Sequence, residues 1–287
     1  MRIAAGEFQK IYDPSIGEDT PWYINDHTLV KGEDGWHLFG ITHKEPKKPL
    51  DERLCAHAFT EDLLRTPMGK RPEPLSADPK ENEAHFWAPH VVFHAGVYYM
   101  FYCAGSLEGH DRYRIHLATS TDLRNWTRHP ENPMLIDGFD ARDPMVIRVG
   151  EEWVMYYTCN STPTGGNHCV AAVTSTDLIH WGNKRVVFES ALAGTYGGPC
   201  ESPFVIRAHG KYVLFIGPYG GYKAAYSKTA IYVSDDPFSF TGEPIGFIDA
   251  HAAEIVSVDG AYYITHCGWG QGGVYLAPLS IEAEERE

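Results

Sequence analysis

Short runs in which apolar and polar residues alternate recur along the chain, each followed by a glycine-containing turn and a second run rich in aromatic residues. A two-residue period is that of a β-strand with one buried face, and the turn between two such runs predicts a β-hairpin. The clearest copies begin at Asp26, Ala88, Asp143, Glu201 and His251. No long stretch has the 3.6-residue period of an amphipathic helix, so the pattern predicts an all-β fold.

The five copies begin 50 to 62 residues apart, a spacing that suits one four-stranded propeller blade with its loops. The second half of each unit also repeats: residues 116–126 and 171–181 are near copies, and residues 57–63 and 231–240 are looser ones. Each predicts a strand followed by an Asp-containing turn. We therefore expect residues 1–287 to form a single domain, a five-bladed β-propeller with four-stranded blades around a central channel. Residues 45–83, rich in Pro, Lys and Glu, are expected to hold the longest irregular loop.

Three carboxylates stand at the starts of the predicted first strands. In a propeller these strands line the channel, so matching positions converge although they are far apart in sequence. The carboxylates are Asp26, Asp143 and Glu201. One Asp before a Pro is typical of a turn, but like charges crowded in a channel cost free energy that function readily explains. Crowding also separates their pKa values, leaving one group protonated as a general acid and another ionised, as glycosidic bond hydrolysis requires.

The motifs at these strand starts resemble a known family. Asp143 directly precedes a proline and Asp26 precedes His27 in the same role, whereas Glu201 and Trp87 each lie two residues before a proline. The order is an Asp in blade one, Trp-Ala-Pro in blade two, Asp-Pro in blade three, Glu-x-Pro in blade four and a His in blade five. This order resembles glycoside hydrolase family 43 and the related invertase-type family 32, which share the five-bladed propeller. The resemblance covers nearly the whole chain.

The resemblance implies roles for the three carboxylates. Asp26 would be the catalytic base, or the nucleophile in retaining relatives, and Glu201 would be the general acid. Asp143 would hold the acid in position, tune its pKa and stabilise positive charge at the anomeric centre. The chemistry of the reaction agrees, because an oxocarbenium-like transition state needs a carboxylate beside it and a leaving oxygen needs a proton.

Two motifs are closer to family 32 and other features to family 43. The Trp-Tyr-Ile-Asn-Asp stretch that ends at Asp26 is similar to the family 32 Trp-Met-Asn-Asp motif, and the Arg-Asp-Pro that begins at Arg142 matches its Arg-Asp-Pro. By this resemblance Asn25 and Arg142 would bind furanose hydroxyls, with Trp22 beside them. However, His27 stands where that motif has Pro, the Trp is displaced by one residue, and we expect no second, β-sandwich domain in the chain. The subfamily stays open.

Further residues are candidates for substrate binding. Trp87 is expected to line the pocket and either stack on a sugar or pack in the core. His90 follows the proline of the same motif and is expected on the strand face. Trp269, with Tyr219 and Tyr222, lies in glycine-rich stretches that predict loops at the channel mouth, where aromatic side chains could form subsite walls.

The chemistry requires no cofactor, but the resemblance implies one candidate metal residue. His251 matches the blade-five His that, in several family 43 relatives, points toward a calcium ion in the channel. Calcium prefers oxygen ligands, so one imidazole and waters would make a weak site. A plain hydrogen-bonding His is the alternative.

Composition and charge indicate which classes of binding partner to expect. The net charge of −14 repels phosphate backbones and anionic membranes, so we expect neither nucleic-acid nor membrane partners. Aromatic residues make up 13% of the chain, with 17 Tyr and 7 Trp, and supply both strand cores and flat surfaces on which sugars stack. Residues 1–7 contain no apolar signal segment, and the six cysteines show no CxxC pairing. These features predict a cytoplasmic protein with reduced cysteines.

The expected function is hydrolysis of terminal furanosyl or pentosyl residues (arabinofuranoside, xyloside or fructofuranoside type) from short oligosaccharides. One alternative is a non-catalytic sugar-binding propeller, against which the set of three carboxylates argues. Another is a phosphorolytic enzyme of the mannoside phosphorylase kind, which needs a cationic phosphate pocket, whereas few basic residues besides Arg142 lie near the motifs. The sugar, the linkage, the stereochemical outcome and the oligomeric state are left open by the sequence.

Overall fold

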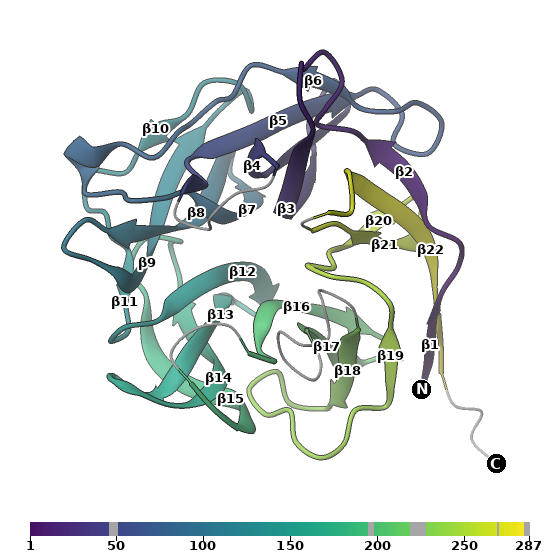
Figure 1. The fold of residues 1–287 in the computed structure, drawn as a ribbon. Coiled ribbons are helices and arrows are strands. Elements are labelled where there is room, and N and C mark those ends of the chain that lie inside the picture. The colour runs from purple at the N-terminus through teal and green to yellow at the C-terminus, as the bar shows by residue number, and fades with distance from the viewer. Residues whose placement is uncertain (46–50, 195–197, 219–227, 269, 284–287) are drawn as a thin grey trace.

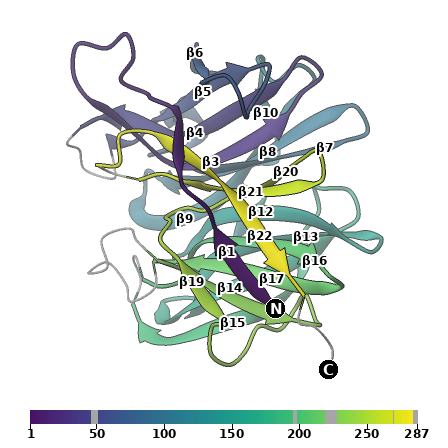
Figure 2. The ribbon, with the colours of Figure 1, turned by 90° about the vertical axis from the view of Figure 1, so that its right-hand side faces the viewer.

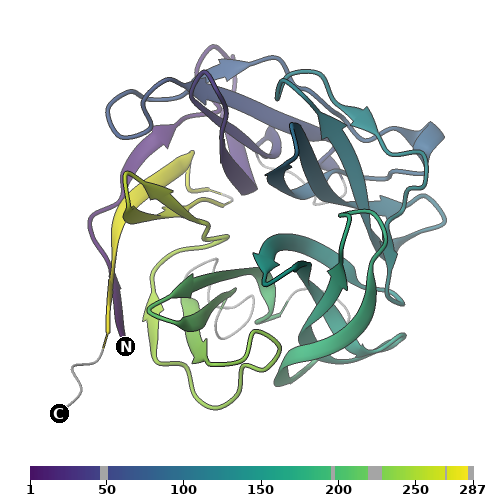
Figure 3. The same cartoon turned by 180° about the vertical axis from the view of Figure 1, so that it is seen from behind.

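Five β-sheets are arranged radially around a central axis in the computed structural model (Figure 1), which describes residues 1–45, 51–194, 198–218, 228–268 and 270–283. The same radial order is seen from the opposite face (Figure 3). The described part of the chain contains one short 3₁₀ turn at Pro79–Glu81 and otherwise strands and loops. The predicted all-β fold and the five-bladed propeller are therefore confirmed.

Four of the five blades are built from strands that follow one another in the chain. Blade one contains β3 (Trp22–Lys31), β4 (Trp36–Lys44), β5 (Leu54–Thr60) and β6 (Gly69–Arg71). Blade two contains β7 (Trp87–His94), β8 (Val97–Ser106), β9 (Gly109–Ser120), β10 (Thr127–Arg128) and β11 (Leu135–Ile136). Blade three contains β12 (Ala141–Val149), β13 (Glu152–Thr162), β14 (Gly165–Ser175) and β15 (Gly182–Ala193). Blade four contains β16 (Glu201–Ala208), β17 (Lys211–Gly217), β18 (Thr229–Ser234) and β19 (Gly246–Ile248).

Blade five is completed by the two ends of the chain. Its C-terminal strands are β20 (Ile255–Val258), β21 (Ala261–His266) and β22 (Val274–Glu282), and β22 pairs with β1 (Arg2–Ala5) and β2 (Gln9–Tyr12). Figure 2 shows β1 lying alongside β22 on the outer side of the blade. Antiparallel pairing of the N-terminal strand with the last strand closes the ring, a feature that the repeat pattern does not predict.

The expectation of an irregular loop at residues 45–83 holds only in part, because β5 and β6 lie within this segment. β5 agrees with the strand predicted at residues 57–63, whereas β6 is only three residues long and exposed or half-buried throughout. Within the described residues of this segment, the irregular parts are residues 61–68 between β5 and β6 and the connection from β6 to β7, which includes the 3₁₀ turn. Residues 46–50 lie outside the described residues.

The hydrophobic core lies between neighbouring blades. Phe39 of blade one and Tyr102 of blade two belong to one buried cluster, and Tyr156 of blade three and Phe215 of blade four to another. All four side chains are fully buried, and burying a large apolar side chain contributes about 1.5–3 kcal/mol. Packing of this kind fixes the rotation of each blade and therefore the direction in which its first strand faces the channel.

The first strands share one irregularity. Register shifts interrupt the pairing of β3 with β4, β7 with β8, β12 with β13 and β16 with β17, each near the start of the strand. One extra residue in the first strand leaves a backbone segment without a ladder partner, so a proline without an N–H group is tolerated there. Three of these bulges contain a proline: Pro89, Pro144 and Pro203. A bulge also re-aims side chains, and here it does so at the channel.

Candidate active site

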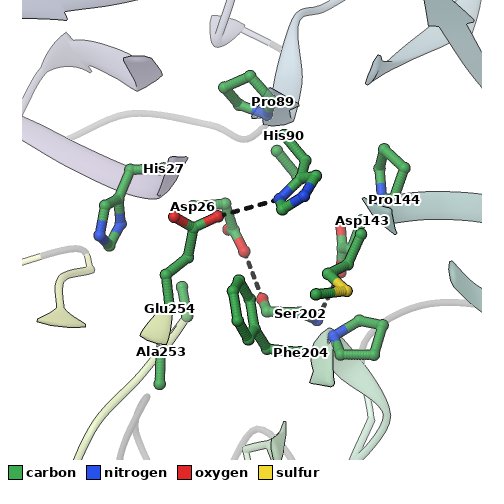
Figure 4. Close-up of a pocket in the computed structure, with 14 residues that line it drawn as sticks. Asp26, His27, Pro89, His90, Asp143, Pro144, Ser202, Phe204, Ala253 and Glu254 are labelled. Atoms are coloured by element: carbon green, nitrogen blue, oxygen red, sulfur yellow. Dashed lines mark hydrogen bonds and ion pairs between the residues drawn. The ribbon is translucent and has the colours of Figure 1, made fainter. Parts of the chain in front are cut away.

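The bulges of blades one to four, and the residues before β20 in blade five, place matching side chains around the channel in three successive positions. The first position is held by Asn25, Trp87, Arg142, Glu201 and His251, the second by Asp26, Ala88, Asp143, Ser202 and Ala252, and the third by His27, Pro89, Pro144, Pro203 and Ala253. The second and third positions line a central pocket of about 310 Å³ (Figure 4). Four of the second-position residues have a left-handed backbone, with φ between 44° and 54°.

Two of the three predicted carboxylates meet on one residue. The Ser202 hydroxyl donates a hydrogen bond to Asp26 Oδ1, and the Ser202 backbone N–H donates to Asp143 Oδ2 at 2.9 Å. Figure 4 shows the three residues converging from β3, β12 and β16. The structure therefore brings Asp26 and Asp143 together, as the blade register predicts. Ser202 is not among the residues predicted from the sequence, although its register position, equivalent to that of both Asp residues, was a signal for it.

Asp26 lies in surroundings that oppose its ionisation. Burial raises its pKa well above the ordinary value, and the charges of Asp143, Glu201 and Glu52 act in the same direction. The hydrogen bond from Ser202 lowers its pKa. The carboxyl group is therefore basic for an aspartate, as a proton acceptor or nucleophile should be.

Asp143 has the larger set of hydrogen bonds. Besides the Ser202 N–H, the Thr158 hydroxyl oxygen lies 3.4 Å from Asp143 Oδ2 and 2.7 Å from the carbonyl oxygen of Cys200, so its single proton serves one of these two acceptors at a time. Burial raises the pKa of Asp143, while Arg142 and the hydrogen bonds lower it. Asp143 is thus fixed in place by its neighbours, which suits a group that orients and stabilises.

Glu201 is paired with Arg142. Arg142 Nη2 lies 3.2 Å from Glu201 Oε1. Burial raises the pKa of Glu201 to about 7, with Arg142 lowering it and the charges of Asp143 and Asp140 raising it. A carboxylic acid with this pKa is still about half protonated at neutral pH, which is the property that a general acid requires.

Arg142 contacts carboxylates on several sides. The side chain is 3% exposed and pairs with Asp140, with Glu201 and, at 3.8 Å, with Asp143 Oδ2. Its guanidinium also lies 5.9 Å from the ring centre of Tyr113. These contacts hold the carboxyl groups, whereas the family resemblance implies that Arg142 binds substrate hydroxyls, a role that remains a prediction.

Asp140 is a second residue that the sequence does not single out. Its side chain is fully buried, and burial raises its pKa to about 6 while Arg142 lowers it. Asp140 directly precedes β12, and its only signal in the sequence is its place two residues before Arg142. Asp140 lies outside the lining of the central pocket and reaches Glu201 only through the arginine.

The predicted aromatic residues are packed in the protein. Trp87 is 6% exposed and stacks on His85 at 3.7 Å between ring centres, with Tyr113 at 5.3 Å. Trp22 is stacked on His43 and has the Lys70 ammonium 4.9 Å from its ring. Both tryptophans therefore have packing partners on their faces, and neither lines the central pocket. Trp269, Tyr219 and Tyr222 lie outside the described residues.

His90 and Glu254 form the floor of the central pocket. His90 Nδ1 lies 3.3 Å from Glu254 Oε1 (Figure 4). On its other side, His90 Nε2 lies 3.2 Å from the carbonyl of Val146. The same two side chains also line a hollow of about 820 Å³ at the other end of the channel. His90 therefore lies below the carboxylates, and its predicted contact with substrate remains a prediction.

His251 and Asn25 contact each other across blades five and one. His251 Nε2 lies 3.1 Å from Asn25 Oδ1, and burial holds the pKa of His251 well below its ordinary value. Among the described residues, no group of three or more His, Cys, Asp or Glu side chains is arranged to hold a metal ion. His251 is therefore in contact with the amide oxygen of Asn25, and its role in metal binding stays a prediction.

None of the described segments forms a helix with the length and hydropathy that a bilayer crossing needs.

Residues 20–245 match the family model of the glycosyl hydrolases family 32 N-terminal domain. Among curated proteins, the probable arabinan endo-1,5-alpha-L-arabinosidase C of Aspergillus niger is 28% identical over 130 residues. That match spans 41% of this chain and 40% of the relative, less than half the length of either.

Two solved structures illustrate the structural similarity. A thermostable family-43 glycoside hydrolase has a TM-score of 0.68 at 18% identity, with 90% of this chain and 89% of that chain covered. The Bombyx mori GH32 beta-fructofuranosidase has a TM-score of 0.70 at 18% identity, with 96% of this chain and 62% of that chain covered. At such identity the similarity shows the fold alone.

Proposed function

Since the chain belongs to glycosyl hydrolase family 32, whose N-terminal domain model matches residues 20–245, we propose that it removes terminal furanosyl or pentosyl residues from short oligosaccharides. The observation that carries the proposal is the convergence of three carboxylates from three blades. Asp26 and Asp143 share Ser202 as a partner, and the pKa of Glu201 is raised to about 7. One protonated and one ionised carboxyl group are what hydrolysis of a glycosidic bond requires.

Each carboxyl group has a distinct proposed role. Glu201 donates its proton to the leaving oxygen. Asp26 in its ionised form activates water or attacks the anomeric carbon. Asp143, held by the Ser202 N–H and by Arg142, stabilises the positive charge that develops on the sugar ring. Because Asp26 must be ionised and Glu201 protonated, kcat/KM should follow a bell-shaped pH profile.

The substrate class rests on the relatives and on the first channel position. The Aspergillus niger relative is named for an arabinan and the Bombyx mori one for a fructofuranoside, that is, for a pentose polymer and a furanose sugar. Asn25, next to Asp26, offers an amide to a sugar hydroxyl. In the cytoplasm, where we expect the protein, the available substrates are small saccharides. Cleavage of terminal residues suits such short substrates.

Phosphorolysis is the less suitable chemistry. Among the described residues that line the central pocket there is no Lys or Arg, and the guanidinium of Arg142 already pairs with carboxylates. A phosphate co-substrate would have no evident cation to bind.

The proposal is tested with aryl furanosides and pyranosides of arabinose, xylose, fructose and galactose. We expect turnover of a furanoside or pentoside by the wild type, and a loss of at least about a hundredfold in Glu201→Gln and Asp26→Asn, because general acid and base steps contribute about 10²–10⁴ each. Aryl glycosides with a good leaving group should recover part of the Glu201→Gln loss but none of the Asp26→Asn loss. NMR of the first-formed anomer assigns retention or inversion.

Full activity of both variants would sink the proposal. Oligosaccharide binding by calorimetry without any turnover would favour the non-catalytic sugar-binding propeller instead. A rate that depends on added phosphate would favour phosphorolysis.

A further inference from the structure

We propose that Ser202 is a positioning residue that holds Asp26 and Asp143 in one fixed mutual orientation. Its hydroxyl donates to Asp26 Oδ1, and its backbone N–H donates to Asp143 Oδ2 at 2.9 Å. A single residue of blade four therefore bridges carboxylates of blades one and three. The inference rests on the proposed function, since it assigns Ser202 its purpose through these two carboxylates.

The bulge at the start of β16 makes this bridge possible. Ser202 has φ 47°, and Pro203 follows it. In a regular strand the N–H would bond to the neighbouring strand, but pairing with β17 shifts between Glu201 and Phe204. The N–H is therefore free of the ladder and points to Asp143, while the side chain points into the channel toward Asp26 (Figure 4). The backbone N–H and the hydroxyl of Ser202 therefore each bind a carboxylate of the site.

The hydroxyl determines how Asp26 is presented. A carboxylate has two oxygens, and with Oδ1 bound to Ser202 the other oxygen is the one presented to a water molecule or an anomeric carbon. Hydrogen bonds to a charged acceptor are among the stronger ones in proteins. The bond favours the ionised form of Asp26 over the protonated form, because Oδ1 accepts a hydrogen bond from the Ser202 hydroxyl and a negatively charged oxygen is the better acceptor.

The other groups around Asp26 act in the opposite direction. Asp143 on β12, Glu201 at the start of β16 and Glu52 before β5 are negatively charged when ionised and raise the pKa of Asp26. Cys267, after β21, has its own pKa raised by burial and by Asp26 and stays a neutral thiol. Ser202 therefore offsets the carboxylates that surround Asp26.

Ser202→Ala tests the inference with little risk to folding. Ala88 and Ala252 occupy the equivalent position in blades two and five, with φ 44° and 47°, so alanine is tolerated in this backbone. We expect kcat to fall about ten- to hundredfold, since a hydrogen bond to a charged group contributes about 1.5–3 kcal/mol. KM should change less than about twofold, and the acid limb of the kcat/KM profile should move to higher pH by about one unit.

Ser202→Cys is the conservative variant. Its thiol is a weak donor of similar shape, so we expect activity and the acid limb to lie between those of the wild type and Ser202→Ala. The exposed Ser257→Ala on β20 is the control and should match the wild type. Unchanged kcat and pH profile in Ser202→Ala would overturn the inference. An equal loss in both Ser202 variants with an unshifted profile would also overturn it, because that is the result of a merely structural role.

A readout besides activity separates this inference from the proposed function. ¹³C-carboxyl NMR of aspartate-labelled protein follows the titration of Asp26, assigned by its loss in Asp26→Asn. We expect Asp26 to titrate at higher pH in Ser202→Ala than in the wild type, and identical titrations would refute the role of Ser202 whether or not the protein is active. A wild type that is inactive on every glycoside, yet shows the shift, would refute only the proposed function.

Discussion

Arg142 Nη2 lies 3.2 Å from Glu201 Oε1, while Nη1 of the same guanidinium pairs with Asp140. The arginine therefore connects the proposed proton donor to a buried carboxyl group outside the central pocket. Arg142 lowers the pKa of Glu201, and the charge of Asp140 raises it. The pKa of Glu201 therefore depends on two neighbours: Arg142, which is in contact with it and lowers the pKa, and Asp140, which pairs with the same arginine and raises the pKa.

Asp140→Asn should change this balance without touching the pocket. With the anion removed, Arg142 acts on Glu201 more strongly, and the pKa of Glu201 should fall below its value of about 7. We expect the alkaline limb of the kcat/KM profile to move to lower pH by about half a unit to one unit. Asp235→Asn, which removes the exposed partner of Lys211, is the matched control. An unmoved alkaline limb in Asp140→Asn would show that Asp140 does not act on the acid.

Glu201→Gln should alter how stability depends on pH. The pKa of Glu201 is raised from 4.5 to about 7 in the folded protein, so folding favours the protonated acid. This contribution is fully present below pH 4.5 and is lost as pH rises through about 7. Glutamine cannot lose a proton, so the variant should gain free energy of unfolding relative to the wild type between pH 4.5 and 8, by up to about 3 kcal/mol. Urea denaturation at the two pH values measures the difference, and a constant difference between the proteins would contradict the raised pKa.

Removal of divalent cations should leave activity unchanged. His251 Nε2 contacts the amide of Asn25, and a metal ion would compete with that hydrogen bond. Dialysis against EDTA, followed by addition of calcium, checks this expectation. Loss of activity that calcium restores would assign His251 to a metal site.

His251→Ala should release the Asn25 amide and raise KM about tenfold, as the loss of one well-placed hydrogen bond does.

Disrupting the strand that closes the ring should destabilise the whole propeller. Ile3 of β1 is partly buried against the hydrophobic cluster of blades three to five. We expect Ile3→Asp to cost about 2–3 kcal/mol, because a charge replaces an apolar side chain in the closing strand, and to lower Tm by about 5–10 °C. Arg2→Gln on the exposed side of the same strand should change Tm by less than about 2 °C. Equal Tm values for the two variants in thermal unfolding would show that β1 contributes little to closure.

Much of the architecture could be predicted from local pattern. The alternation of residues, the turns and the repeat spacing predict five blades, and the resemblance to propeller glycoside hydrolases is confirmed by the family 32 model over residues 20–245. The open choice of subfamily is answered by the same match. The alignment of strand starts places Asp26 and Asp143 at one position and Glu201 one residue before it, and the bulges preserve this offset. A repeat encodes position along a strand, so these features follow from sequence alone.

Contacts between blades required the tertiary structure. The bonds from Ser202 join residues 59 and 176 positions apart, and nothing in the neighbourhood of Ser202 in the sequence specifies either partner. The pairing of Arg142 with Glu201 and the closure of the ring by β1 are of the same kind. The sequence by itself determined which residues stand at the channel. Only the packing of the blades decided which of their atoms come within hydrogen-bond distance, because that distance depends on how each blade is rotated about the axis.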